Sequence, residues 1–207
     1  MTAEQARREF DADVVWLPFD LHPEYPPEGI PLADLHRRYG IGVGEHDPLR
    51  DRFGAVGLDY NRPEVVPNTR LALRMSELAR ERGLNQPFHD RLMDAYWSEA
   101  TNIGDPDELR RLAAEVGLDA EEVERVIADP AAYLDLVEDS TRQAFSVGIN
   151  AVPAFVLDRR LIVLGAQPLE VFRRAFAQLA AREPVSKSAT GWPAALGGAS
   201  RRPRSRP

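Results

Sequence analysis

The stretch Gly148–Gly165, GINAVPAFVLDRRLIVLG, decides the fold that we predict for this chain. Its apolar runs Ala154–Leu157 and Leu161–Leu164 contain the β-branched and aromatic residues that are typical of buried strands. The polar triplet Asp158-Arg159-Arg160 separates the two runs by a length that suits a short hairpin connection. We therefore predict a β-hairpin, preceded by a loop that ends at Val152-Pro153.

Two interpretations of Pro153 are open from its spacing alone. A trans proline can open an edge strand, where a missing N–H costs little. Only about 5–6% of X–Pro bonds in folded proteins are cis, which favours this first interpretation. A cis bond would instead fix the shape of the loop, with support from the surrounding structure.

Outward from the hairpin, the chain is mostly helical. Apolar residues recur at helical spacing from Asn68 to Phe145, and Gln167-Pro168 opens a last helix with an apolar stripe. A short apolar strand is predicted near the start of the chain, at Val14–Phe19. This order of strand, helical block, hairpin and helix predicts an α/β domain with a helical insertion at about residues 30–147.

Several helix ends carry recognisable signals. Asn68, Asp105 and Asp119 are of residue types that cap helix N-termini, and Pro106 occupies the favoured first helical position. A longer helix is expected over about residues 131–147, with Tyr133 and Phe145 among the side chains that face the core.

The charge of the chain is unevenly distributed. The formal net charge is −7, but residues 184–207 contain five bases and no acid, which leaves 21 bases against 33 acids, or −12, in the remainder. An acidic body argues against a nucleic-acid-binding face. The composition of residues 184–207 predicts a disordered basic tail, and residues 1–183 are assigned to the folded domain.

No apolar run approaches the roughly 20 residues that a membrane span needs, and Met1–Asp13 is too charged for a signal peptide. We therefore expect a cytoplasmic protein without a membrane partner. The four histidines lack metal-ligand spacing, and no phosphate-binding or nucleophile motif occurs, so neither a cofactor nor a metal is expected.

The sequence contains no cysteine, which excludes disulfides and thiolate catalysis within these 207 residues. We therefore name no catalytic residue in this chain.

Several segments, taken in order, resemble the DsbA-like thioredoxin-fold proteins of the FrnE type, close to the 2-hydroxychromene-2-carboxylate isomerases. The matching segments are Val15–Pro23, Asn68-Thr69 with Ala72, Ala95–Trp97, Ala113–Asp119, Gly148–Val156 and Gly165–Pro168. The resemblance runs from about Val14 to Leu179. It implies that Pro153 is the cis-proline beside the active site and that Val152 and Pro153 contact the substrate.

The resemblance also implies what these residues lack. The family begins with a strand and a Cys-x-x-Cys pair at a helix N-terminus, where the helix dipole favours the thiolate. Neither the first strand nor the Cys-x-x-Cys helix start has a counterpart here, and Met1–Phe10 corresponds to the last turns of that helix. Because the missing strand would lie between Val14–Phe19 and Ala154–Leu157, we expect a thioredoxin-like α/β fold with an open place in its sheet.

Three functions follow as hypotheses. The first is a dithiol–disulfide oxidoreductase whose cysteines precede Met1 in the natural product. The second is a non-catalytic module that binds peptides in a chaperone-like manner, and the third is a relative of the glutathione-dependent isomerases. The expected partners are thiol- or disulfide-bearing protein or peptide substrates. The oligomeric state is open, although unpaired strands would favour association.

Overall fold

The computed structural model describes residues 3–40, 48–61 and 63–181 of the chain. The chain divides into two compact units. One contains residues 1–17 together with 142–207, and the other contains residues 18–141. The predicted basic tail, at 184–207, lies outside the described residues.

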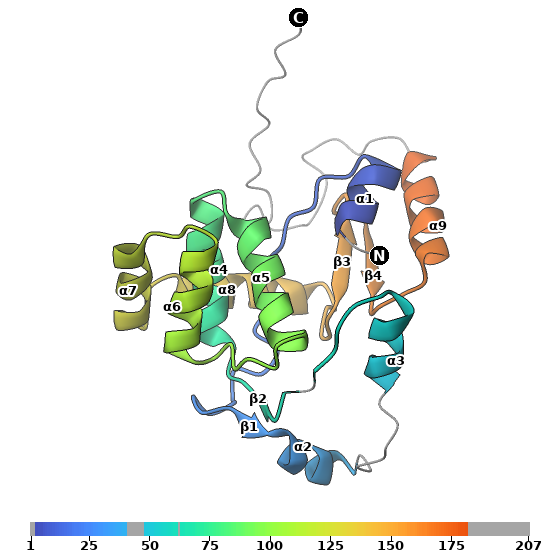
Figure 1. Ribbon diagram of the computed structural model, residues 1–207. Helices are drawn as coiled ribbons and strands as arrows, with labels where there is room; N and C mark the ends of the chain where they lie inside the picture. The colour runs from blue at the N-terminus through green and yellow to red at the C-terminus, as the bar shows by residue number, and fades with distance from the viewer. Residues whose placement is uncertain (1–2, 41–47, 62, 182–207) are drawn as a thin grey trace, which may run out of the picture. The chain divides into compact units, whose positions relative to one another are not determined.

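The unit of residues 18–141 is built mainly from helices. Its α4 (Arg70–Glu81), α5 (Asn85–Trp97), α6 (Pro106–Glu115) and α7 (Ala120–Ala128) pack against one another (Figure 1). They enclose an apolar core centred on Met75, Phe88, Leu109 and Leu112, each with no exposed surface. Before these helices come α2 (Leu32–Tyr39), α3 (Pro48–Ala55) and the antiparallel pair β1 (Ile30–Pro31) and β2 (Val65–Val66), in which Ile30 faces Val66.

The predicted caps of this unit are present, with one shift. Asp105 accepts a hydrogen bond from the backbone of Asp107 at 2.8 Å, and Asp119 accepts one from Glu122 at 3.0 Å. Thr69, not Asn68, occupies the N-cap position of α4. Asn68 still satisfies a free helix N–H, because its side-chain oxygen accepts from Arg70 at 3.0 Å.

A buried arginine fastens α4 to the end of α7. Arg74 is 6% exposed, and its Nε donates to the carbonyl of Ala132 at 2.7 Å. Its Nη2 donates to the carbonyls of Val126 and Asp129. Carbonyls in the last turn of a helix lack partners in their own helix, so this cation stabilises the end of α7. Burial lowers the pKa of Arg74, and the charge of Asp129 opposes that shift.

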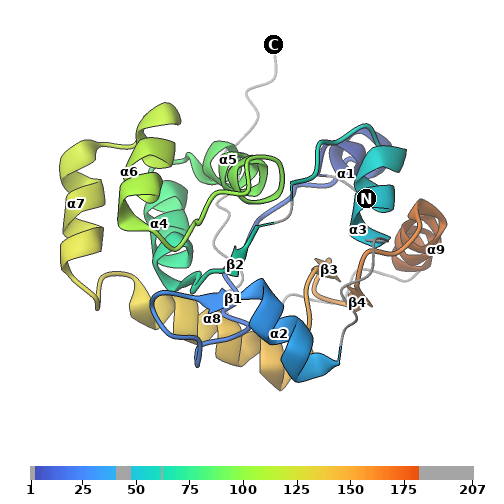
Figure 2. The same ribbon diagram turned by 60° about the horizontal axis from the view of Figure 1, so that its bottom comes forward.

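The other unit contains the predicted hairpin. β3 (Ala154–Leu157) and β4 (Leu161–Leu164) pair antiparallel, with Ala154 opposite Leu164 and Leu157 opposite Leu161. One face packs on α9 (Leu169–Ala180) around Phe172, which is fully buried and makes an edge contact with Phe155 at 4.9 Å. The segment α1 (Ala3–Phe10) lies beside α9 (Figures 1 and 2), and the rings of Phe10 and Phe176 stack at 4.1 Å.

Three sequence predictions about local structure differ from the structure. Val14–Phe19 is not a strand, and within the described residues β3 pairs only with β4. A strand requires a hydrogen-bonded neighbour, and apolar composition alone does not provide one. The long helix, α8, is Leu134–Ser146 and begins later than expected because Tyr133 adopts a left-handed conformation with φ 59°. Phe145 was expected in the core and is 49% exposed.

No helix within the described part of the chain is long and apolar enough to cross a membrane.

Candidate functional site

The loop between α8 and β3 is fixed at both ends and exposed in the middle. At its start, Ile149 is 6% exposed, and its N–H donates to the carbonyl of Ala144 at 3.0 Å. At its end, the carbonyl of Pro153 accepts from the N–H of Gly165 at 2.7 Å. Between these anchors Asn150, Ala151 and Val152 are all exposed. The hairpin core therefore holds a short stretch of backbone out toward solvent.

The Val152–Pro153 peptide bond is cis. This confirms the cis isomer that the resemblance implied for Pro153, and it removes the trans alternative that spacing alone had favoured. Val152 is 55% exposed, and Leu164, which follows Val163 at the end of β4, is 41% exposed. Leu164 pairs with Ala154, which lies two residues after Val152. The apolar side chains of Val152 and Leu164 therefore lie at the same end of the hairpin.

The side chains of this loop lack the groups that acid–base and nucleophilic catalysis use. Residues 148–157 contain no acid, base, hydroxyl or thiol in their side chains. The residues therefore supply no nucleophile and no proton-transfer group of their own. What they offer a ligand is apolar surface, main-chain polar groups and the side-chain amide of the exposed Asn150. Within the described residues, neither the N–H nor the C=O of Val152 has a hydrogen-bond partner.

The family model of the DSBA-like thioredoxin domain matches residues 1–177 of this chain. The chain belongs to the DsbA-like thioredoxin domain family. This result agrees with the motif resemblance and with the position of the cis-proline before β3.

Two similar proteins and one structure that is alike in fold give the DsbA-like domain its context. An uncharacterized protein of Bacillus subtilis strain 168, YwbO, is 31% identical over 175 residues, covering 83% of this chain and 84% of the relative. The crystal structure of a probable DsbA oxidoreductase from Streptomyces coelicolor is 36% identical and superposes with a TM-score of 0.78, covering 86% of this chain and 80% of that one. A 2-hydroxychromene-2-carboxylate isomerase is 16% identical, covers 86% of each chain, and has a TM-score of 0.62, a likeness in fold alone.

Polar contacts hold residues 18–25, which begin the unit of residues 18–141 in this DsbA-like domain. Asp20 is 7% exposed, its carboxylate accepts from Nε of Arg70 at 3.1 Å, and its N–H donates to Oγ1 of Thr141 at 2.9 Å. The ring of His22 stacks on Tyr25 at 4.4 Å. These contacts fix the chain path of residues 18–25 and assemble no catalytic group.

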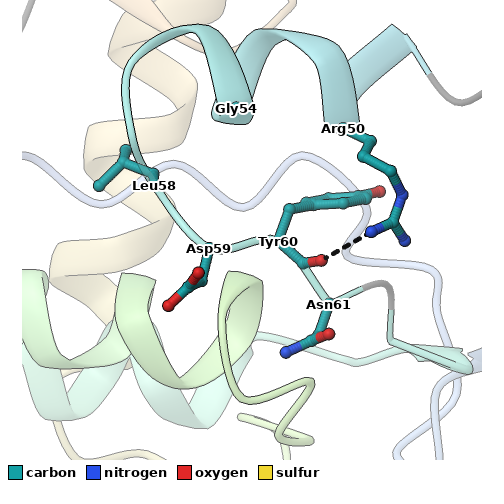
Figure 3. A pocket seen from close by; sticks show the side chains of 6 residues that line it. All are labelled: Arg50, Gly54, Leu58, Asp59, Tyr60 and Asn61. Carbon is teal, nitrogen blue, oxygen red and sulfur yellow. Dashed lines mark hydrogen bonds between the residues drawn. The ribbon is translucent and has the colours of Figure 1, made fainter.

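A hollow of about 360 Å³ lies between α3 and the chain that follows it (Figure 3). The guanidinium of Arg50 lies 5.4 Å from the centre of the Tyr60 ring, and its Nη1 donates to the Tyr60 carbonyl at 3.4 Å. In Figure 3 the side chains of Leu58, Asp59 and Asn61 point away from Arg50. The lining therefore does not converge on one point, and we assign no function to this hollow.

No group of three histidine, aspartate or glutamate side chains that could hold a metal ion occurs in residues 3–40, 48–61 and 63–181 of the DsbA-like domain. The roles of Val152 and Pro153 in substrate binding stay predictions. Sequence analysis did not identify the contact from Gly165 to Pro153. The available signal was a glycine directly after an apolar strand, where a turn with positive φ is expected.

Proposed function

We propose that this chain carries the substrate-binding surface of a DsbA-like dithiol–disulfide oxidoreductase, and that Val152 and Pro153 contact an extended peptide of the substrate. The observation that carries the proposal is the exposed loop ending in cis-Pro153, with Val152 55% exposed and its backbone polar groups unpaired within the described residues. Family membership supports the same assignment.

The redox step itself needs sulfur from outside these residues. Thiol–disulfide exchange proceeds through attack of a thiolate on a disulfide, and a mixed disulfide forms. The 207 residues contain no cysteine. The polypeptide alone is therefore expected to bind peptide without exchanging disulfides, and redox activity would require a Cys-x-x-Cys pair supplied by preceding residues of the natural product.

Peptide binding is tested by fluorescence anisotropy, with a labelled, reduced and carboxymethylated unfolded protein as the ligand. Val152→Asp should weaken binding about tenfold, because the variant removes half-exposed apolar surface and places a charge against an apolar ligand. The matched control is Val56→Asp, at a valine 69% exposed in the other unit. Equal effects of the two changes would exclude Val152 from the binding surface.

The source of the dithiol is tested by the intact mass of the protein made in its own cells. A product heavier than 23.1 kDa that contains two additional cysteines supports the oxidoreductase. A product of 23.1 kDa that binds unfolded protein supports the second candidate function, a non-catalytic peptide-binding module, which the absence of cysteine favours.

A further inference from the structure

The turn that follows β4 makes the backbone contact that closes the Val152 loop. The N–H of Gly165 donates to the carbonyl of Pro153 at 2.7 Å, and this bond lies one residue beyond the last paired position of the hairpin, Ala154 with Leu164. The end of the loop is thus held by the first residue after β4. Displacement of Gly165 would move Pro153 and the exposed residue before it.

Gly165 is suited to this turn by its conformation. Its φ is +77°, a region in which residues with a Cβ are strained by about 1–2 kcal/mol. Space is not the constraint, because an added Cβ would meet Nε2 of Gln167 at 3.6 Å, an ordinary contact distance. Replacing Gly165 therefore alters the preferred backbone conformation without a steric clash.

Gln167 closes the same turn from the other side. Its side-chain Nε2 donates to the carbonyl of Leu164 at 2.9 Å, and its backbone N–H donates to the carbonyl of Gly165 at 2.9 Å. The side chain is exposed and is not part of the apolar core behind the hairpin. Among the described residues, the Gln167 side chain therefore contributes its hydrogen bond to the Leu164 carbonyl, which orients the backbone on either side of Gly165.

We infer that Gly165 and Gln167 are positioning residues that set the direction of the exposed Val152 backbone for an incoming peptide. This inference rests on the proposed function. With the Pro153 carbonyl occupied by Gly165, the N–H and C=O of Val152 are among the neighbouring groups left for a ligand. A peptide that pairs with one residue needs that residue in a fixed orientation, because hydrogen bonds weaken steeply with misalignment.

The first test replaces Gln167 with glutamate. An ionised Glu has nearly the same shape but only accepts hydrogen bonds, so it cannot donate to the Leu164 carbonyl. Gln167→Glu should weaken binding of the carboxymethylated unfolded protein roughly two- to fivefold and shift the Val152 amide resonance in the free protein. The matched control, Gln178→Glu, makes the same chemical change at an exposed glutamine of α9 and should alter neither quantity.

The second test replaces Gly165 with alanine, which should weaken binding roughly five- to thirtyfold if the strain is relieved by moving the loop. Gly117→Ala is the control for strain, because Gly117 has φ +84° and open space around it in the other unit. The control should lower the melting temperature without changing peptide affinity. Alanine at Gly165 should change both.

The outcomes separate this inference from the function on which it rests. An unchanged Val152 resonance in folded Gln167→Glu, or wild-type affinity in both Gln167→Glu and Gly165→Ala, overturns the positioning role while the binding function stands. A wild-type chain that does not bind the unfolded protein overturns the proposed function, and the amide resonance then still reports whether Gln167 sets the loop.

Discussion

Replacing Arg74 with methionine should destabilise the helical unit by about 3 kcal/mol. Methionine retains the apolar part of the side chain but removes donors from the carbonyls of Val126, Asp129 and Ala132. A buried acceptor without a partner costs about 1–3 kcal/mol. Val126 is buried, whereas Asp129 is exposed, so water can replace part of the loss there. Methionine also removes the free-energy penalty of burying the charged guanidinium, and this gain offsets a further part of the cost.

The assay is urea unfolding followed by tryptophan fluorescence in a chain that carries Trp16→Phe and Trp192→Phe, so that the signal comes from Trp97 in α5 of the same unit. The midpoint should fall while the slope m stays unchanged, the signature of altered stability in a two-state transition. The control is Arg125→Met on α7, because Arg125 is 73% exposed and its ion pair with Glu122 spans 3.4 Å. Its effect should stay below about 0.5 kcal/mol. A loss under about 1 kcal/mol for Arg74→Met would refute the anchoring role.

Three further predictions concern titration, capping and the hairpin core. Burial, followed by a hydrogen bond to Glu81, raises the pKa of Tyr133 to about 12, so its stabilising contribution is complete below about pH 10 and is lost as the pH rises toward 12. Tyr133→Phe should abolish that high-pH step in the tyrosine absorbance titration. Asp119→Ala should cost about 1 kcal/mol in urea unfolding through loss of the α7 cap. Phe172→Ala should cost about 3–5 kcal/mol, because the ring is fully buried between α9 and the hairpin.

Each of these changes has a control and a contradicting result. Tyr39→Phe alters an exposed tyrosine, and loss of the same titration step there would contradict the assignment to Tyr133. Asp107→Ala removes a carboxylate that is 90% exposed, and a cost equal to that of Asp119→Ala would argue against capping. Phe145→Ala removes a ring that is 49% exposed, so a cost as large as that of Phe172→Ala would contradict the core described for the hairpin.

The elements that sequence predicted well are those determined by nearby residues. The hairpin runs and the polar turn were predicted at their observed limits, because strand composition and the break between strands are local properties. Asp105 and Asp119 were identified as caps for the same reason, since a cap bonds to a backbone N–H within the first turn of its own helix. The cis bond at Pro153 was indicated by family resemblance, and spacing alone favoured the other isomer.

The elements that sequence missed depend on distant partners. Val14–Phe19 has the composition of a strand, but no described strand pairs with it. Arg74 is buried because three carbonyls from residues 126–132 converge on it, which a helical pattern around residue 74 cannot indicate. In the candidate site, too, local features were predicted and contacts with distant residues were not. Val152 and Pro153 were identified by motif, whereas the contacts of Gly165 and Gln167 became visible only when the end of β4 was placed beside Pro153.

The exposed loop at Val152 and Pro153 is the surface that we propose binds unfolded substrate. The most direct measurement is an NMR titration of the isotope-labelled chain with a reduced, carboxymethylated unfolded protein, in which every backbone amide is followed. We expect the largest shifts on Ala151, Val152 and Gly165, whose N–H groups lie in or against the loop. Shifts confined to the hollow at Arg50 and Tyr60, or no shifts at all, would contradict the proposal.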